Sequence, residues 1–489
     1  MKMIYTLIIA ILIVSSIGCI AATEEKYYTP NTKSPDIKIT GDWQLTIGGD
    51  YDVAGTLIHI PEQTITVEKP TIVSVKNEKY ENIGIFDPKA PFWCQGVRVQ
   101  GTSNGETGAR GSLDAKSFVV KGDPEGKVIY KLDKDYGLGA EWGFFGRLAN
   151  ENIVEDRTKG TAMIDANLLD QESATNVETQ GSSIKEGDTV YVDYEYAKWR
   201  LDTIATDKNG KLSYITGEAG IQIINPPTLP EGLYPVCNIF TRSNTDKIHM
   251  DMIYPITELR KPAGKNEVPA IKTLLTRTYD KLVNKKEICI LYWGDSVTCG
   301  GSVTDYDKYV WQNVVSRELE KKYPNTKFRF ETTAWGGRGV GNFFETPIGQ
   351  AYNFQEHVLD LKPDLVIMEF VNDTYQFITP DLLVENYNKV RDIFAEKDID
   401  WVIMLPHFTD FDRASFGTEK YRTEQRWYDK WIRKEYCEKY PNIAVADASV
   451  LWGHLLFEGI PFCTLNVNGI NHPCNEGHQI LANGVLDLF

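Results

Sequence analysis

The sequence lacks the features that identify several classes of protein. None of its eight cysteines belongs to a CxxC pair, so the sequence favours neither a metal cluster nor a full disulfide framework. It contains no stripe of lysine and arginine, no zinc-finger spacing and no RNA-binding signature, and its formal net charge is −16. Nucleic acid and anionic membranes repel a chain of that charge. We therefore expect neither nucleic acid nor a metal ion as a partner.

Long apolar runs are also scarce, and no segment after the N-terminus is long and apolar enough to cross a membrane. Residues 1–22 contain one early lysine, an uncharged apolar run at 4–14 and then small residues, which is typical of a secretory signal peptide. Residues 16–19 resemble a lipoprotein signal with Cys19 as the lipid anchor, whereas 19–21 could be an ordinary cleavage site. A retained signal anchor is a third alternative. We expect an exported protein, either secreted or held in the cell envelope as a lipoprotein.

The length and composition indicate a folded protein with more than one domain. At 489 residues, 42% hydrophobic and 25% charged, the chain is too long for one compact core and too apolar for a disordered protein. Residues 190–196 (VYVDYEY) alternate in the manner of a half-buried strand, and Asn209-Gly210 marks a hairpin turn because both residues tolerate positive φ. We expect a β-rich, sandwich-like accessory region over 23–258, in one or two modules with a boundary near residue 120.

The character of the sequence changes after a connecting segment at 259–285. From 286 to 489 the pattern predicts strands at 287–296, 327–335, 363–370, 400–406 and 442–448, and helices at 309–323, 342–360, 380–397 and 418–439. Strands separated by helices pair in parallel through right-handed crossovers. The expected fold class is therefore multidomain, with an N-terminal β-rich region and a C-terminal three-layer α/β domain built on a parallel sheet. In such a domain the working site lies beyond the carboxyl ends of the strands.

Four short stretches lie where chemistry is expected in this fold. Ser296 follows the first strand in GDS, although a serine there, taken alone, is more typical of a helix cap than of a nucleophile. The glycines of GGRG at 336–339 follow the second strand, where they let the backbone turn sharply and expose amides that can stabilise an oxyanion. Asn372 follows the third strand, and its amide could donate to a developing negative charge. His472 lies in a loop before the last helix.

In this order, GDS at 294–296, GGRG at 336–339, VND at 371–373 and NHP at 471–473 resemble the four blocks of the SGNH (GDSL-like) hydrolase family. The resemblance covers residues 286–489 and does not extend to the β-rich region. It implies an SGNH hydrolase-like domain that needs no metal or organic cofactor.

The resemblance also implies roles for individual residues. Ser296 would be the nucleophile and His472 the general base. The oxyanion hole would consist of the backbone amides of Ser296 and Gly337 with the side chain of Asn372, and Gly339 is the alternative glycine. The expected reaction is a two-step acyl transfer through an acyl-serine, which defines a carboxylic ester hydrolase.

Two positions depart from the family pattern. Phe370 stands where the third block usually begins with glycine, which would narrow the pocket. Gly469 stands where an acid usually precedes the histidine by three residues, Asn468 is one residue further away, and no Asp or Glu lies in that loop. A backbone carbonyl, a Ser-His dyad or a carboxylate from elsewhere, such as Glu369, could replace the acid. The sequence leaves these alternatives open.

The substrate can be inferred only from context, because a fold does not name it. An exported, acidic chain with a large aromatic-rich β half resembles the carbohydrate esterases, so we expect the removal of short acyl groups, above all O-acetyl, from an extracellular carbohydrate. The alternatives are a lipase or thioesterase, an acyltransferase of the same fold, and a catalytically lapsed glycan-binding surface protein. Trp93, Trp142 and Trp199 could be sugar platforms, but each is more typical of a sandwich core. His407 could contact substrate or have a structural role.

Two further expectations concern residues near the C-terminus. Cys463 and Cys474 flank a loop and are the best candidates for one disulfide in an exported protein, with two buried free thiols as the alternative. His478 is expected to pack at the start of the last helix rather than to act in catalysis.

Overall fold

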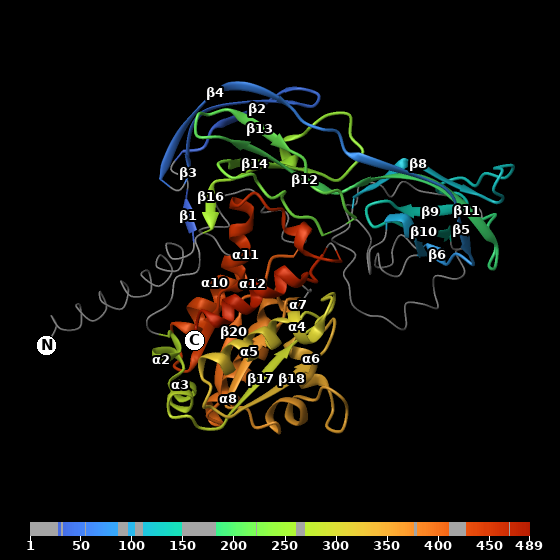
Figure 1. Ribbon diagram of the computed structural model, residues 1–489. Helices are drawn as coiled ribbons and strands as arrows, with labels where there is room; N and C mark the ends of the chain where they lie inside the picture. Colours follow the sequence, from blue (N-terminus) through green and yellow to red (C-terminus); the bar gives the residue numbers. More distant parts are fainter. Residues whose placement is uncertain are drawn as a thin grey trace.

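The computed structural model describes residues 28–30, 33–53, 55–86, 96–102, 111–148, 182–221, 223–260, 269–375, 379–409, 427–468 and 470–489. The expected signal peptide at 1–22, with Cys19, and also Trp93 and Gly469 lie outside these residues. The β-rich half arches over one end of the α/β domain, on the side of helix α11 (Figure 1). Among the described residues, no helix combines the length and apolar character that crossing a membrane requires.

A five-stranded parallel sheet forms the centre of the C-terminal half, in the order β18-β17-β19-β20-β21. This confirms the parallel sheet and its five strands. The strands are β17 (Ile288–Gly294), β18 (Phe328–Ala334), β19 (Leu365–Glu369), β20 (Asp400–Met404) and β21 (Ile443–Ala446).

Helices cover both faces of this sheet because alternate strand residues enter two separate cores. Ile290 and Tyr292 of β17 pack into one core, and Leu291 and Trp293 pack into the other. The first core is covered by α2 (Ile271–Leu274), α3 (Thr276–Val283), α5 (Trp311–Lys322) and α12 (Asn475–Leu486). The second is covered by α6 (Val340–Glu345), α8 (Pro380–Glu396) and α10 (Trp427–Ile432). The short helices α4 (Tyr306–Tyr309) and α7 (Asn372–Tyr375) follow strand ends.

Three expectations about this half need correction. The helix expected over 342–360 is broken into α6 and a π-helical turn at Gln355–Leu359, with Pro347 and Gly349 between them. The segment 259–285 is not entirely a linker, because α2 and α3 contribute Ile271 and Leu282 to the first core. The helix expected at 418–439 is described only from residue 427, as α10 and a π-helical turn at Arg433–Cys437.

Helix α11 (Ala448–Phe457) was not anticipated, because it has no polar face to produce a helical period. Most of its residues are buried, and a helix that is apolar all round is one enclosed by other elements. It lies between the α/β domain and the β-rich half, where it contacts strands β15 and β16.

The β-rich half contains two units. In the first β unit, the sheet β2-β3-β4 and the sheet β13-β12-β14-β15 share one apolar core. Its strands are β2 (Asp36–Gly41), β3 (Gln44–Val53), β4 (Thr56–Thr66), β12 (Arg200–Thr206), β13 (Leu212–Ile215), β14 (Tyr234–Thr241) and β15 (Ile253–Pro255). The predicted hairpin at Asn209-Gly210 is confirmed, since β12 and β13 pair antiparallel and Gly210 has φ +81°. Strands β1 (Tyr28–Pro30) and β16 (Glu258–Arg260) pair antiparallel.

The second unit, residues 71–198, is inserted between β4 and β12 and is called the inserted unit below. It contains the sheet β5-β11-β8 and a smaller sheet formed by β6, β7, β9 and β10. Its strands are β5 (Thr71–Glu81), β6 (Ile85–Phe86), β7 (Val97–Arg98), β8 (Leu113–Lys121), β9 (Tyr136–Gly139), β10 (Phe144–Leu148) and β11 (Thr189–Lys198). The alternation predicted at 190–196 is confirmed, because the residues at 190, 192, 194 and 196 are all buried. A boundary near residue 120 is wrong, since it would cut β8.

The two halves of the chain are joined by backbone and side-chain hydrogen bonds. The side-chain amide of Asn238 donates to the carbonyl of Gly459 (2.9 Å), and the backbone amide of Thr257 donates to the carbonyl of Phe457 (2.8 Å). Gly459 has φ +76°, and a Cβ there would lie 2.7 Å from Ile256. Glycine is therefore required for this close approach.

Candidate active site

The structure brings Ser296 and His472 into direct contact. A hydrogen bond of 2.9 Å joins Ser296 Oγ and His472 Nε2, although 176 positions separate the two residues. Ser296 follows β17 and is half-buried, so solvent reaches it. A hydroxyl bonded to an imidazole nitrogen in this way can lose its proton to that nitrogen as it attacks a carbonyl.

The other predicted site residues follow the strands on either side of β17. The glycines at 336 and 337 follow β18, and Asn372 follows β19, so all three come from neighbouring strand ends. A Cβ built on Gly336 would lie 3.6 Å from the Cβ of Ser296, which places the glycine turn beside the serine. Gly337 has φ +72°, a conformation that favours glycine.

Backbone amides near Ser296 are available as donors. Among the hydrogen bonds of the described residues, none has the amide N–H of Ser296 or of Gly337 as its donor. The amide of Gly339, the alternative glycine, donates to Oδ1 of Asn342 at 3.0 Å. It is therefore already engaged, and Gly337 is the better choice. Unengaged backbone amides of this kind can stabilise an oxyanion.

Asn372 is buried and held in position. Its side-chain amide donates to the carbonyl of Arg338 (3.1 Å), which belongs to the same turn as Gly337. Its backbone amide donates to Oδ2 of Asp295 (2.9 Å). The asparagine is thus anchored both to the glycine turn and to the residue before Ser296.

Asp295 has a role that the sequence did not reveal. Its carboxylate is fully buried and accepts from the backbone amide of Val297 (3.0 Å) through Oδ1 and from that of Asn372 through Oδ2. One side chain therefore links the serine turn to the end of β19. The GDS stretch contained the signal, but only the fold shows which amides the aspartate binds.

Glu369 does not replace the missing acid. Its carboxylate accepts from the hydroxyl of Thr298 (2.8 Å) and from the backbone amide of Val371 (3.0 Å). Among the hydrogen bonds of the described residues, none joins Glu369 to His472. Like Asp295, it is fully buried. The expectation that Glu369 could orient His472 is not supported, because its oxygens accept from the end of β19 and from the turn that follows Ser296.

Burial of these carboxyl groups has a consequence for stability. A third buried carboxyl group belongs to Asp373 in α7, which accepts from the hydroxyl of Tyr387 (3.0 Å). Burial raises the pKa of Asp295 and that of Asp373 from 3.8 to about 7, against the opposing effect of their hydrogen-bond donors, and it raises the pKa of Glu369 well above its usual range. A carboxyl with a raised pKa binds more protons in the folded state than in the unfolded state. Because the unfolded state gives up these protons at lower pH, each such aspartate lowers the free energy of unfolding as pH rises from 3.8 to about 7.

The histidine is carried by a short, well-braced segment, residues 466–473, called the histidine loop below. Asn466 and Pro473 form a β-bridge, and the amide of Val467 donates to the carbonyl of His472 (2.7 Å). Inside the loop, Oδ1 of Asn468 accepts from the backbone amides of Ile470 (3.0 Å) and of residues 471 and 472 (2.9 Å each). Asn468, noted above only for its position, thus organises the backbone that presents His472.

Two further residues lie around the imidazole of His472, and a structural role was expected for only one of them, His407. His407 is fully buried, packs against Trp452 with the ring centres 4.9 Å apart and the planes tilted by 54°, and donates a 2.8 Å hydrogen bond to the carbonyl of Asn471. This excludes substrate contact and favours the structural role. Gly301 lies beside the ring, because a Cβ there would be 3.4 Å from His472 Nδ1.

The remaining candidates are structural. His478 is a buried residue of α12 and accepts a hydrogen bond from the amide of Trp311 (3.3 Å). Burial lowers its pKa to about 3, as expected of a packing residue. No disulfide joins Cys463 and Cys474, so the expected bridge is wrong. Cys474 belongs to an apolar core, and Cys463 packs against another.

Trp142 and Trp199 are buried and are not sugar platforms. Among the described residues, no group of histidine, cysteine or acidic side chains is arranged to hold a metal ion.

Comparisons with known proteins give a distant likeness. No protein-family description matches the sequence, and no curated protein is similar to it. Among solved structures, a two-domain esterase (CEX) active on acetylated mannans matches with a TM-score of 0.34 and 16% identity, over 45% of this chain and 53% of that chain. Axe2, an acetylxylan esterase from Geobacillus stearothermophilus, matches with a TM-score of 0.33 and 20% identity, over 41% of this chain and 92% of that chain. The chain thus spans about half the length of the mannan esterase, and the likeness is confined to part of the fold.

Proposed function

We propose that this protein is an exported serine esterase of the SGNH type that removes short acyl groups, O-acetyl above all, from an extracellular carbohydrate. The observation that carries the proposal is the 2.9 Å contact between Ser296 Oγ and His472 Nε2. The amide of Ser296 and that of Gly337, which follows the glycine beside the serine, donate to no acceptor among the described residues. The carbohydrate and the export rest on the signal-like N-terminus and the large β-rich half.

In the first step, Ser296 Oγ attacks the ester carbonyl while its proton passes to His472 Nε2. The carbonyl oxygen becomes negatively charged and receives hydrogen bonds from the amides of Ser296 and Gly337 and from the side chain of Asn372. When the tetrahedral intermediate collapses, the ester C–O bond breaks, and His472 returns the proton to the alcohol that leaves. Water then attacks the acyl-serine by the same route and releases the acid.

No acidic side chain is assigned to His472 in this proposal. The histidine loop restricts the position of the ring, since Asn468 fixes the backbone at residue 472, and Gly301 leaves the space that the imidazole occupies.

The test is ester hydrolysis by the purified protein. Hydrolysis of p-nitrophenyl acetate is compared with that of the butyrate and octanoate esters, and acetate release is measured from a chemically acetylated polysaccharide. Ser296→Ala and His472→Ala should remove the activity, and Asn372→Ala should lower kcat by about 10²-fold, the usual cost of losing one oxyanion donor. His59→Ala, which alters an exposed histidine in the first β unit, is the matched control and should be unaffected.

The outcomes separate the alternatives. Activity that survives in Ser296→Ala would refute the mechanism. A preference for octanoate over acetate would refute the short-acyl assignment and favour a lipase, and transfer of the acyl group to an added alcohol in preference to water would favour an acyltransferase. Absence of activity on every ester would favour a lapsed, glycan-binding protein.

A further inference from the structure

One apolar side chain of the histidine loop is buried against residues that are distant from it in the sequence. Ile470, two residues before His472, is only 7% exposed, yet it belongs to neither core of the α/β domain. It forms a separate cluster with Trp142 and Phe144 of the inserted unit, which are 8% and 6% exposed. The loop that carries the histidine is therefore covered from outside the α/β domain.

The two aromatic residues are presented by a hairpin that is itself well fixed. Trp142 lies in the turn between β9 and β10, where its amide donates to the carbonyl of Gly139 (3.1 Å), and Phe144 begins β10. The amide of Val99 donates to the carbonyl of Gly143 (2.8 Å), and the guanidinium of Arg98 lies 4.9 Å from the centre of the Phe144 ring. The hairpin turn thus presents a rigid apolar surface to Ile470.

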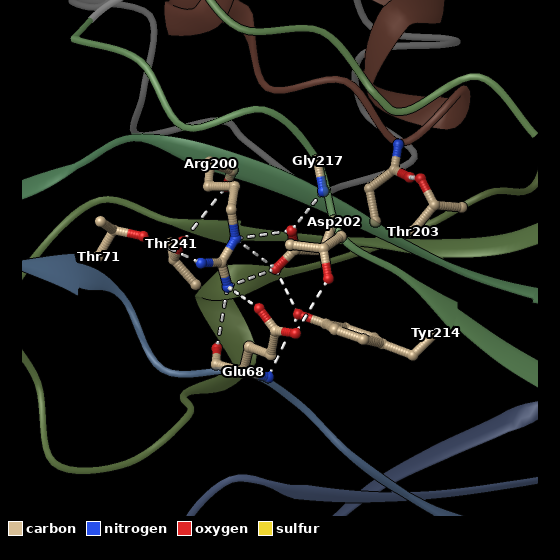
Figure 2. Close-up of polar contacts among 10 residues, drawn as sticks. Glu68, Thr71, Arg200, Asp202, Thr203, Tyr214, Gly217 and Thr241 are labelled. Carbon is tan, nitrogen blue, oxygen red and sulfur yellow. Dashed lines mark hydrogen bonds and ion pairs between the residues drawn. The ribbon is translucent and has the colours of Figure 1, made fainter.

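The base of the inserted unit is clamped at the point where the chain enters and leaves it. Figure 2 shows the guanidinium of Arg200, at the start of β12, within a polar network. It pairs with the carboxylate of Asp202 (Nε to Oδ1, 2.7 Å) and donates to the carbonyl of Glu68 and the hydroxyl of Thr71 (3.2 Å each). Glu68 and Thr71 lie on the entering strand connection, and Arg200 lies on the leaving one.

Asp202 extends this clamp within the first β unit. Its carboxylate accepts from the hydroxyl of Tyr214 and from the backbone amide of Gly217 (2.8 Å) (Figure 2). Arg200 and Asp202 are both buried, and a buried charged pair with this many hydrogen bonds is costly to disrupt. The inserted unit is therefore fixed at its base by Arg200 and in contact with the histidine loop at its far end.

We propose that the inserted unit positions His472 by bracing the histidine loop through Trp142, Phe144 and Ile470, so that turnover in the α/β domain depends on a residue of the β-rich half. Trp142 is a positioning residue in this proposal, because it acts through Ile470. The catalytic consequence rests on the proposed function. The bracing of the loop does not, and it can be measured in a protein without esterase activity.

The first test is kinetic. Trp142→Ala and Ile470→Ala should each lower kcat on p-nitrophenyl acetate by about 10-fold with little change in KM, because misplacing a catalytic group by about 1 Å can cost up to 10²-fold. The double variant should be no slower than the slower single variant, since both changes remove one contact. Trp142→Phe should retain most of the activity.

The matched control is Phe118→Leu, which alters a buried aromatic in the core of the inserted unit. Phe118 packs on Phe145 at 5.3 Å and belongs to a different cluster from Ile470. This change should leave kcat unchanged. Its effect on the thermal midpoint should add to the effect of Ile470→Ala on the same quantity. Thermal unfolding of each variant shows whether it is folded.

The second test is amide hydrogen exchange of the full chain, which does not depend on activity. Trp142→Ala should speed the exchange of amides at 467–472, and Phe118→Leu should not. Faster exchange in a protein whose wild type hydrolyses no ester would support the brace and reject the proposed function. A folded Trp142→Ala variant with wild-type exchange and wild-type kcat would overturn the inference while leaving the proposed function intact. A Phe118→Leu variant as impaired as Trp142→Ala would also overturn it, since the effect would then reflect general loosening of the unit.

Discussion

The arrangement of the histidine loop predicts that Asn468 is essential to the position of His472. A single oxygen, Oδ1 of Asn468, accepts from three successive backbone amides, at 470, 471 and 472, over 2.9 to 3.0 Å. Asn468→Ala removes this acceptor and leaves three donors in a mostly buried loop without it. Asn468→Asp keeps an oxygen in the same place and is the matched control.

The expected magnitude follows from the number of bonds. With about 1 kcal/mol for each hydrogen bond, Asn468→Ala should lower the free energy of unfolding by about 3 kcal/mol. Because the amide at 472 belongs to the histidine itself, the ring should shift, and kcat should fall by about 10²-fold. Asn468→Asp should recover most of both losses, although it exchanges the 2.9 Å bond from the Asn468 amide to Asn471 Oδ1 for a contact between two oxygens.

The assay combines urea unfolding with p-nitrophenyl acetate kinetics on the same three proteins. Wild-type stability and kcat in Asn468→Ala would refute the argument that these bonds hold the loop. An Asn468→Asp variant as impaired as Asn468→Ala would show that the effect comes from something other than the shared acceptor.

Three other changes test the surroundings of the site. Gly301→Ala places a Cβ 3.2 Å from the backbone carbonyl of Ser296 and 3.4 Å from His472 Nδ1, so it crowds both members of the pair and kcat should fall while the thermal midpoint changes little; an unchanged kcat would show that both neighbours have room to spare. Asp295→Asn replaces one carboxylate oxygen with an NH2 group, which then faces either the Asn372 amide or the serine turn. A charged hydrogen bond contributes about 1.5 to 3 kcal/mol, so kcat should fall by about 10-fold or more. An equal kcat would mean that the link from the serine turn to the end of β19 is dispensable. Asp373→Asn removes a carboxyl with a pKa of about 7, so the decline in unfolding free energy between pH 5 and pH 8 should become shallower in urea titrations, and an unaltered slope would contradict the raised pKa.

Much of the α/β domain could be predicted because its sequence alternates between two clear periods. The buried strand at 287–296 and the helix at 309–323 each carry an unambiguous apolar pattern, and both are present. Helix α11 was missed because burial on all sides removes the period. The break in the helix expected at 342–360 was missed because apolar residues continue through it.

The contacts around the site were harder to predict than the residues in it. Ser296 and His472 follow from motif order, and the structure places them in contact. The links made by Asp295 join amides that are distant in the sequence, so no local pattern records them. The contact of Trp142 with Ile470 depends on where an inserted unit folds back, which periodicity does not encode.

The most direct test of the central claim is to identify the residue that a fluorophosphonate modifies in the full-length protein while p-nitrophenyl acetate hydrolysis is followed. The account predicts that peptide mapping finds the phosphonyl group on Ser296, that activity declines in step with labelling, and that His472→Ala slows both. Hydrolysis that persists in fully labelled protein, or a label on another residue, would contradict the assignment of Ser296 as the nucleophile.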